Sequence, residues 1–419
     1  MGELYNRCGN GYYDLGQYSL AKEWHYKVLE IRERVLGKEH LDTVITYNDL
    51  GLVCCIQGDY LPALKWYNKA LEIREKILGK EHLSTSTIYN NLAAVYGLQG
   101  NYPLALEWYN KALEIREGEL GKEHPVTATT YNNLAGIYKS QEDYPAALEL
   151  YNKALEVRER VLGKEHPSTS QVYNNLAGVY KLQGDHMTAI EMYNKALEIA
   201  EKVLNKEHPV VTIMYNNLAG VYESQGDYSA ALEIYKKILE VRERVLGKEH
   251  SSTSEVYYTL AKVYEFKGDY STALEMYNKV FEIKEKVLGK EHTTTATVCN
   301  DIAGVYYYQG NYPSALKWYN KALMIVERVL DRDHAGVAIT YNNLGLVCES
   351  QGDYPSALEW YNKALKIREK VFGKDHPDTL AICDNRDRVK LSMERVGFTS
   401  KIRMFIWACL DKIKESFRT

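Results

Sequence analysis

The sequence has no long hydrophobic run and no strong excess of charge of either sign. It contains neither a stretch of about 18 apolar residues nor a secretory or myristoylation signal at its N-terminus. Lys and Arg number 52 against 56 Asp and Glu, a formal net charge of −4 over 419 residues. This balance gives no reason to expect nucleic acid as a partner. We therefore expect a cytoplasmic protein.

The motifs of catalysis and metal binding are also missing. The chain has no GxGxxG, P-loop, HExxH or GxSxG match in a suitable context, and its seven cysteines form no paired CxxC. Nine of the 11 histidines recur at one place in a repeat, too far apart to share a zinc ion. We predict no enzyme, no cofactor and no metal site, with cysteines in the core and these histidines holding a turn into the next helix.

What the sequence does have is an internal repeat. Rows of 42 residues align without insertion or deletion on one aromatic or cysteine position. The aligned residues are Tyr5, Tyr47, Tyr89, Tyr131, Tyr173, Tyr215, Tyr257, Cys299, Tyr341 and Cys383.

Each row contains two helical patterns. The first runs through segments such as YNNLAGVY (173–180) to a QGD turn, and the second runs from a segment such as YPAALELY (144–151) to a glycine. Proline suits the first turn of a helix and glycine its end. Proline stands at the second starts at Pro103, Pro145, Pro313 and Pro355, and glycine at the ends at Gly79, Gly121, Gly163 and Gly247. The rows therefore predict antiparallel helix pairs.

The rows resemble the tetratricopeptide repeat family. With Tyr131 as position 4, Leu134, Ala135, Tyr138, Ala147, Tyr151 and Ala154 fall at positions 7, 8, 11, 20, 24 and 27, which matches the pattern of that family. The connector LGKEHPST (162–169) and the 42-residue period resemble kinesin light chains. The resemblance implies an all-α fold, an α-α superhelix of nine helix-pair repeats over 1–382, with a basic amphipathic C-terminal cap or tail over 383–419.

The side of the first helix opposite its packing stripe is the candidate binding site. Positions 4, 7, 8 and 11 form the stripe, whereas positions 2, 5, 6, 9 and 13 lie opposite. In the family the first helices line a concave groove, where asparagine at position 6 pairs with the main chain of a bound peptide. The predicted groove residues are Asn90, Asn91, Asn132, Asn133, Gly136, Lys139, Asn174, Asn175, Gly178, Lys181, Asn216, Asn217 and Gly220.

Not every repeat follows this pattern. Asp49 and Asp301 replace the amide at position 6, and Thr259 interrupts it. Position 12 changes from Lys139 and Lys181 to glutamate, so we expect a groove that is basic in its middle and acidic toward its end; the glutamates are Glu223, Glu265 and Glu349. An alternative stays open, in which repeat duplication copied the asparagines without any binding role.

The preferred function is a non-enzymatic scaffold that binds peptide segments of partner proteins in the groove. Because Met1 opens directly into a repeat, only the cargo-binding part of a kinesin light chain would carry over. Two alternatives are a self-associating structural solenoid and the regulatory repeat arm of a larger signalling protein. The sequence does not determine the oligomeric state, which would distinguish the self-associating solenoid from the other two functions.

The C-terminal tail differs from the repeats. Residues 386–419 carry nine Lys or Arg against four acidic residues, and an apolar helical stripe follows. The stripe consists of Ile402, Phe405, Ile406, Cys409, Leu410, Ile413 and Phe417. A cap on the last repeat is the favoured interpretation; a basic membrane contact or a segment folded into the groove are the alternatives.

Overall fold

The computed structural model describes residues 2–14, 17–331 and 333–395, and every regular element in these ranges is a helix. The chain divides into two compact units, Met1–Val221 and Tyr222–Thr419. The first contains α1 (Gly2–Asp14), α2 (Tyr18–Val35), α3 (Leu41–Ile56), α4 (Tyr60–Leu78), α5 (Leu83–Leu98), α6 (Tyr102–Leu120), α7 (Pro125–Ser140), α8 (Tyr144–Val161), α9 (Pro167–Leu182) and α10 (His186–Leu204).

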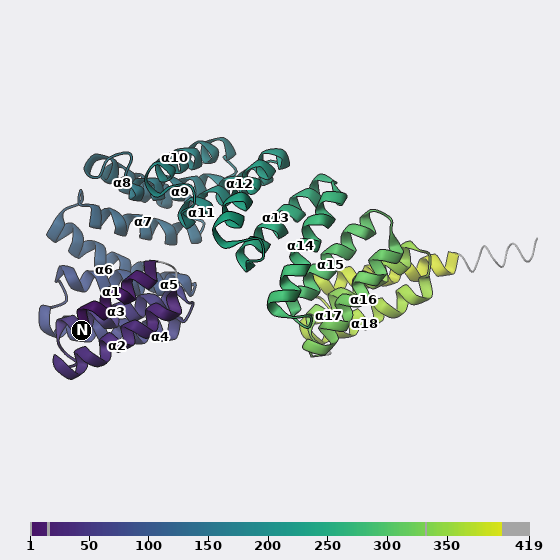
Figure 1. The fold of residues 1–419 in the computed structure, drawn as a ribbon, viewed down its shortest axis with the longest axis horizontal. Helices are drawn as coiled ribbons and strands as arrows, with labels where there is room; N and C mark the ends of the chain where they lie inside the picture. The colour runs from purple at the N-terminus through teal and green to yellow at the C-terminus, as the bar shows by residue number, and fades with distance from the viewer. Residues whose placement is uncertain (1, 15–16, 332, 396–419) are drawn as a thin grey trace, which may run out of the picture. The chain divides into compact units, whose positions relative to one another are not determined.

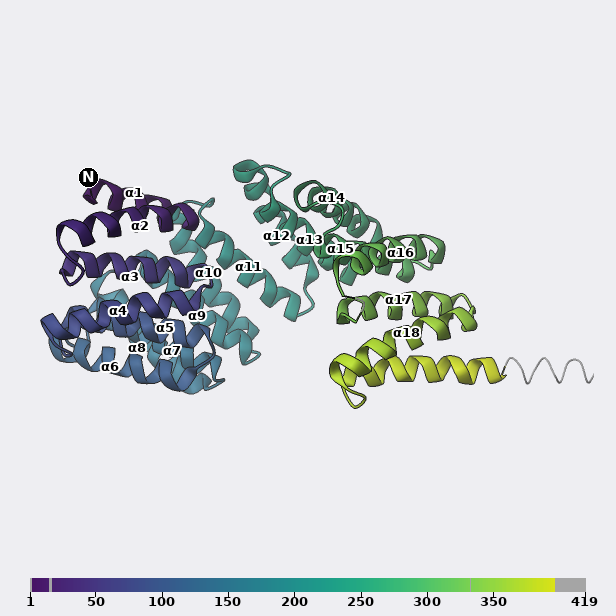
Figure 2. The ribbon, with the colours of Figure 1, turned by 90° about the horizontal axis from the view of Figure 1, so that it is seen from below.

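The division falls inside α11 (Pro209–Ser224). The second unit continues with α12 (Tyr228–Leu246), α13 (Ser251–Lys267), α14 (Tyr270–Leu288), α15 (Thr293–Tyr308), α16 (Tyr312–Val329), α17 (Ala335–Ser350) and α18 (Tyr354–Phe372). Residues 377–395 are also helical. Within each unit the two helices of a pair pack together and successive pairs follow in chain order (Figure 1; Figure 2). The predicted α-α solenoid of helix pairs is confirmed.

Each first helix from α3 onward begins at a histidine cap. In α9, His166 precedes the helix with extended backbone, and its Nδ1 accepts the backbone N–H of Ser168 at 3.1 Å. This bond satisfies one of the helix donors that have no partner inside the helix. The same bond recurs at 3.0–3.2 Å from His40, His82, His124, His208, His250, His292, His334 and His376. The predicted role of these histidines is confirmed.

The second helices begin and end at the predicted residues. In α8, Asp143 caps the N-terminus by accepting the N–H of Ala146 at 3.1 Å, and Pro145 lies in the first turn. Gly79, at the end of α4, has φ of 90°, a conformation that favours glycine because other residues meet steric strain there.

Small and aromatic side chains make the core between the paired helices. Ala147, Tyr151 and Ala154 of α8 are buried in one cluster with Ala135 of α7, whereas Leu134 of α7 is buried in a second cluster with residues of α6. A hydrogen bond then ties consecutive repeats: the hydroxyl of Tyr131 donates to Glu117 at the end of α6, at 2.5 Å. The tyrosines of position 4 therefore pack in the core and also join consecutive repeats through a hydrogen bond.

The helical pattern continues past the predicted boundary at 382. Residues 377–395 form one helix in which Ile382 and Val389 are buried. Arg388 makes a bidentate ion pair with Glu349 of α17, at 2.6 and 2.9 Å. This helix occupies the place of a tenth first helix. The predicted apolar stripe from Ile402 to Phe417 lies outside the described residues.

Candidate functional site: the first-helix face

Neighbouring first helices contact one another in the first unit, where α5 lies against α3 and α7, and α7 against α9. We call the side of these helices that carries positions 5, 6, 9 and 12 the first-helix face. Sequence periodicity places these positions away from the core, and most of their side chains are indeed only partly buried.

The asparagines of this face bond to one another across repeats. In each case Nδ2 at position 6 donates to Oδ1 at position 5 of the preceding repeat, and we call this bond an amide rung. The first unit has four rungs, which join Asn91 to Asn48 (2.8 Å), Asn133 to Asn90 (3.2 Å), Asn175 to Asn132 (2.9 Å) and Asn217 to Asn174 (3.0 Å). Asn385 and Asn342 form another in the second unit, at 3.2 Å.

The rungs leave part of each amide unused. An asparagine has two N–H donors and an oxygen with two lone pairs, and a rung takes one donor from one residue and one lone pair from the other. Asn133 and Asn175 remain half-buried, Asn132 is 8% exposed, and Asn216 is exposed. Except for Asn216, which forms no rung, the predicted asparagines are thus joined in a ladder. Asn132 and Asn174 also donate to Asn133 and Asn175, at 3.3 and 3.5 Å, and each amide still keeps a donor or a lone pair without a protein partner.

The glycines of position 9 make room for the lysines of position 12. The ammonium nitrogen of Lys139 lies 3.9 Å from where a Cβ on Gly178 would stand, and that of Lys181 lies 2.9 Å from the same point on Gly220. The side chain of each lysine therefore extends over the glycine of the next repeat. At Gly136 the corresponding neighbour is the hydroxyl of Tyr151, at 3.6 Å. A larger residue at Gly220 would displace Lys181.

Burial lowers the pKa of the Lys139 ammonium because the charged form loses solvation. Within the described ranges, no carboxylate lies within 4.0 Å of Lys139 or Lys181. A desolvated cation without a counter-ion attracts an anionic group.

The acidic residues of the second unit are already engaged. Glu223, Glu265 and Glu349 accept the hydroxyls of Tyr235, Tyr277 and Tyr361 at 2.5, 2.7 and 2.7 Å. Burial acts to raise the pKa of the Glu349 carboxyl, but Arg388 and Tyr361 outweigh it, so that the pKa is lowered. Position 12 thus changes from lysine in α7 and α9 to glutamate in α11, α13 and α17. Each of these glutamates accepts a tyrosine hydroxyl, and Glu349 is also paired with Arg388.

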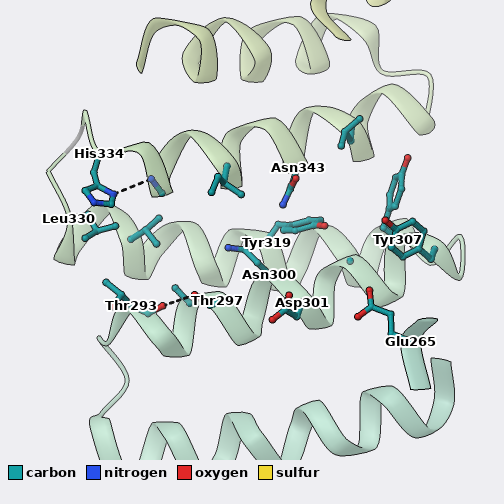
Figure 3. A pocket seen from close by; sticks show the side chains of 17 residues that line it. Glu265, Thr293, Thr297, Asn300, Asp301, Tyr307, Tyr319, Leu330, His334 and Asn343 are labelled. Carbon is teal, nitrogen blue, oxygen red and sulfur yellow. Dashed lines mark hydrogen bonds between the residues drawn. The ribbon is translucent and has the colours of Figure 1, made fainter. Parts of the chain in front are cut away.

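A hollow of about 640 Å³ opens on the first-helix face of the second unit. Asn300 and Asp301 line it from α15, Asn343 from α17 and Tyr319 from α16 (Figure 3). Asp301 accepts the hydroxyl of Tyr258 at 2.8 Å and the ammonium of Lys262 at 2.9 Å. Here a tyrosine and an aspartate replace the two asparagines of a rung, with the donor on the preceding repeat.

Sequence reasoning missed the partners that complete this face. Asn48, Asn342 and Asn385 belong to amide rungs, and Tyr258 bonds to Asp301 in place of one, but none of the four was among the predicted groove residues. The signal was available as a separation of 43 residues between position 5 of one repeat and position 6 of the next, which is the separation in every rung. Helical periodicity alone predicts which side of the helix a residue lies on, but it does not predict which residue of the neighbouring repeat it contacts.

In the part of the chain that the structure describes, His, Cys, Asp and Glu side chains form no group of three or more suited to a metal ion. Cys54, Cys299 and Cys348 are buried, and burial raises the pKa of the Cys299 thiol to about 12. Among the described helices, none combines the length and the apolar character needed to cross a membrane.

The repeated helix pairs, with a polar first-helix face, place the protein in the class of α-α solenoid repeat proteins. The tetratricopeptide repeat family profile matches residues 1–76, 50–118, 84–160, 126–202, 210–286 and 292–370. The chain belongs to the tetratricopeptide repeat family. No curated protein gives a significant match.

Solved structures with a similar fold include repeat proteins of several kinds. A Podosopora anserina putative kinesin light chain with nearly identical TPR-like repeats is 24% identical over 49% of this chain and 98% of its own, with a TM-score of 0.44. BtubC from P. vanneervenii is 23% identical over 55% of this chain and 92% of its own, with a TM-score of 0.45. A signal transduction ATPase with numerous domains and a tetratricopeptide repeat sensor, from Pyrococcus horikoshii, is 16% identical over 93% of this chain and 54% of its own, with a TM-score of 0.60. These likenesses concern the fold.

Proposed function

We propose that this protein is a non-enzymatic scaffold that binds peptide segments of partner proteins along the first-helix face. The observation that carries the proposal is the amide ladder of the first unit, in which each rung leaves donors and lone pairs unused at the surface. A peptide main chain offers the complementary N–H and C=O groups whatever its side chains are. Membership in a family of repeat proteins whose members generally bind proteins supports the same function.

The two lysines define the preferred ligand of the first unit. Lys139 and Lys181 lie on consecutive first helices with no carboxylate beside them, and burial weakens the solvation of Lys139. An acidic side chain on the bound segment would supply the missing counter-ions. The ligand proposed for this unit is therefore an acidic peptide.

The test uses a display library of unstructured peptides and two matched triple variants. Asn133, Asn175 and Asn217 changed to alanine remove three donors of the face, and we expect selected peptides to lose binding. Asn110, Asn152 and Asn194 lie exposed on the second helices, so their change to alanine is the control and leaves binding intact. Equal binding by both variants would contradict the proposal.

Charge reversal tests the lysines separately. Lys139→Glu with Lys181→Glu should weaken acidic peptides and reduce the dependence of their affinity on salt, because the attraction that salt screens is gone. Lys153 and Lys195 form exposed ion pairs within second helices, and their change to glutamate is the control for net charge. An unchanged salt dependence in the first variant contradicts the assignment.

A kinesin-light-chain-like cargo adaptor is the particular form of scaffold that the connector pattern favours. It requires that the selected peptides come from cargo proteins. A self-associating solenoid is the competing function, and sedimentation over a range of concentrations separates the two, since a chain that stays monomeric at tens of micromolar does not self-assemble. The regulatory arm of a larger signalling protein would require further domains on the same polypeptide.

A further inference from the structure

One ion pair recurs between the connectors of the repeats and the second helices. A basic residue at position 33, near the end of a second helix, pairs with the acidic residue at position 38 of the preceding repeat. The pair is formed by Lys76 with Glu39 at 2.8 Å, Arg160 with Glu123 at 2.7 Å and Lys202 with Glu165 at 3.1 Å, and also by Lys286 with Glu249, Arg328 with Glu291 and Lys370 with Asp333.

This pair cannot form at the end of α6, because Gly118 takes position 33. Every other repeat has Lys or Arg at this position. The acidic residue that stands opposite is Glu81, and within the described ranges no cation lies within 4.0 Å of it. A Cβ on Gly118 would meet no heavy atom of another part of the chain within 4 Å. The place of the basic side chain is therefore open.

The next residue makes the end of α6 more acidic. Glu119 occupies position 34, which is valine or isoleucine in every other repeat. Neither residue suits the helix, since glycine is a poor helix former and an acidic residue near the C-terminus lies at the negative end of the helix dipole. Departures from local preference that bring no packing benefit are expected at sites with a function.

A hollow of about 690 Å³ lies at this junction, and we call it the α6 hollow. Gly118 and Glu81 both line it, and Ile115 and Trp108 give it an apolar surface. Its lining comes from α4, the connector at 80–81, α5 and α6, and it includes no residue of the first-helix face.

The corresponding place in the second unit shows the effect of the basic side chain. A hollow of about 380 Å³ is lined there by Glu249, Ile283 and Lys286, which stand four repeats after Glu81, Ile115 and Gly118. Lys286 is paired with Glu249. The α6 hollow is thus the larger of the two and lacks the cation.

The lining of the α6 hollow has an excess of negative charge. It contains four glutamates and two lysines. One lysine, Lys111, is paired with Glu107 outside the lining, at 2.7 Å. Over the described residues, Glu114 and Glu119 have no cation within 4.0 Å. A basic ligand is therefore complementary to this surface.

We propose that the α6 hollow binds a basic segment of a partner protein, one of whose arginine or lysine side chains takes the place left open by Gly118. Its charged end pairs with Glu81, and its aliphatic part lies on Ile115 and Trp108. The occupant is a protein segment because a protein side chain fills this place in the other repeats. The site lies outside the first-helix face, so this inference goes beyond the proposed function.

Fluorine NMR on protein labelled with 5-fluorotryptophan reports on this site directly. Trp108 lines the hollow, whereas Trp66, Trp318 and Trp360 occupy the same position of repeats that have Lys or Arg at position 33. The probe is a capped peptide of eight residues in which arginine and serine alternate, at low ionic strength. We expect it to shift the resonance of Trp108, assigned from the spectrum of Trp108→Phe, and to leave the other three in place.

Two control ligands define the chemistry of the occupant. The same peptide with glutamine in place of arginine should shift none of these resonances. Acetylarginine amide should require at least a fivefold higher concentration than the peptide, because it offers one cation to several carboxylates. Equal affinity for this amide would assign the hollow to small basic molecules and overturn the binding of a segment.

Gly118→Lys supplies the basic side chain from within the chain. It should weaken the probe fivefold or more, which corresponds to the loss of one ion pair, and the melting temperature should be maintained or raised because lysine is the better helix former. Gly118→Ala is the matched control, which improves the helix without adding a charge and leaves the affinity unchanged.

Removal of the carboxylate tests the same contact from the other side. Glu81→Gln should weaken the probe about fivefold, whereas Glu165→Gln, at the junction where Lys202 is present, should leave the affinity unchanged. Equal affinity of wild type and Gly118→Lys, equal shifts of Trp108 and Trp66, or no shift of Trp108 at millimolar probe would each overturn the inference.

Discussion

Two aspartates at position 6 of the first-helix face show how strongly one residue depends on its neighbours. Asp301 receives a tyrosine hydroxyl and a lysine ammonium. Asp49 stands opposite Asn6 in the repeat pattern, and Oδ1 of Asn6 is buried without a partner. Burial raises the pKa of Asp49 to about 6, although Asn48, Arg32 and Arg74 act in the opposite direction. The carboxylate at position 6 thus has hydrogen-bonding partners in the repeat of Asp301, whereas in the repeat of Asp49 burial disfavours its charged form.

The raised pKa of Asp49 predicts a dependence of stability on pH. Between about pH 4, where the unfolded carboxyl titrates, and pH 6, the folded protein binds more protons than the unfolded chain, so this residue's contribution to stability falls as pH rises. Asp49→Asn should therefore raise the free energy of unfolding by about 1–2 kcal/mol at pH 8, with a smaller effect at pH 4.5. Urea unfolding at the two pH values measures the difference.

Asp301→Asn is the matched control for this prediction. It removes a carboxylate that is bonded to Tyr258 and Lys262, so it should lower stability at pH 8 instead of raising it. A gain in stability from both substitutions would show that the effect comes from net charge and not from the surroundings of Asp49.

At the scale of the helix, the histidine cap replaces the Ser, Thr, Asp or Asn that usually stands at this position. His166→Ala removes the acceptor for Ser168, so it should lower the free energy of unfolding by about 1 kcal/mol. His166→Asp supplies another acceptor and should retain most of the stability. A comparison of the two variants by urea unfolding checks the cap, and equal losses in both would indicate that the imidazole acts through packing.

Sequence periodicity was sufficient for the helices but not for the contacts between them. Proline at the start and glycine at the end located α6 and α8 because these residues act through their own backbone. Asn174 could be assigned to the correct side of α9 by the same local argument. The hydrogen bond between Asn174 and Asn217 could not be predicted by that argument, because it depends on the distance between α9 and α11.

For the whole molecule, the helix of residues 377–395 decides where the fold ends within the described chain. Val389 is fully buried and Arg388 is paired with Glu349. Truncation after residue 385 should lower stability by about 2 kcal/mol or more, since it exposes the surface that Val389 covers and removes Arg388, the cation paired with Glu349. Melting of this truncation, compared with truncation after residue 395, assigns the loss to the described helix.

The same truncations separate the remaining roles of the tail. A membrane contact predicts that only the full chain binds anionic vesicles and that salt releases it. A segment folded onto the groove predicts that truncation after residue 395 raises peptide affinity without lowering the melting temperature. An unchanged melt after truncation at residue 385 would contradict the capping role of the helix.

The direction of the amide rungs determines which repeats can be exchanged. A repeat with asparagine at both positions, such as the one with Asn132 and Asn133, offers an acceptor to its successor and a donor to its predecessor. Where such repeats follow one another, from α5 to α11, every junction between them closes with a rung. The repeat with Asp301 needs a hydroxyl before it, which Tyr258 supplies, so these two can be moved only as a block. A permuted array that separates them would leave a carboxylate facing an amide oxygen.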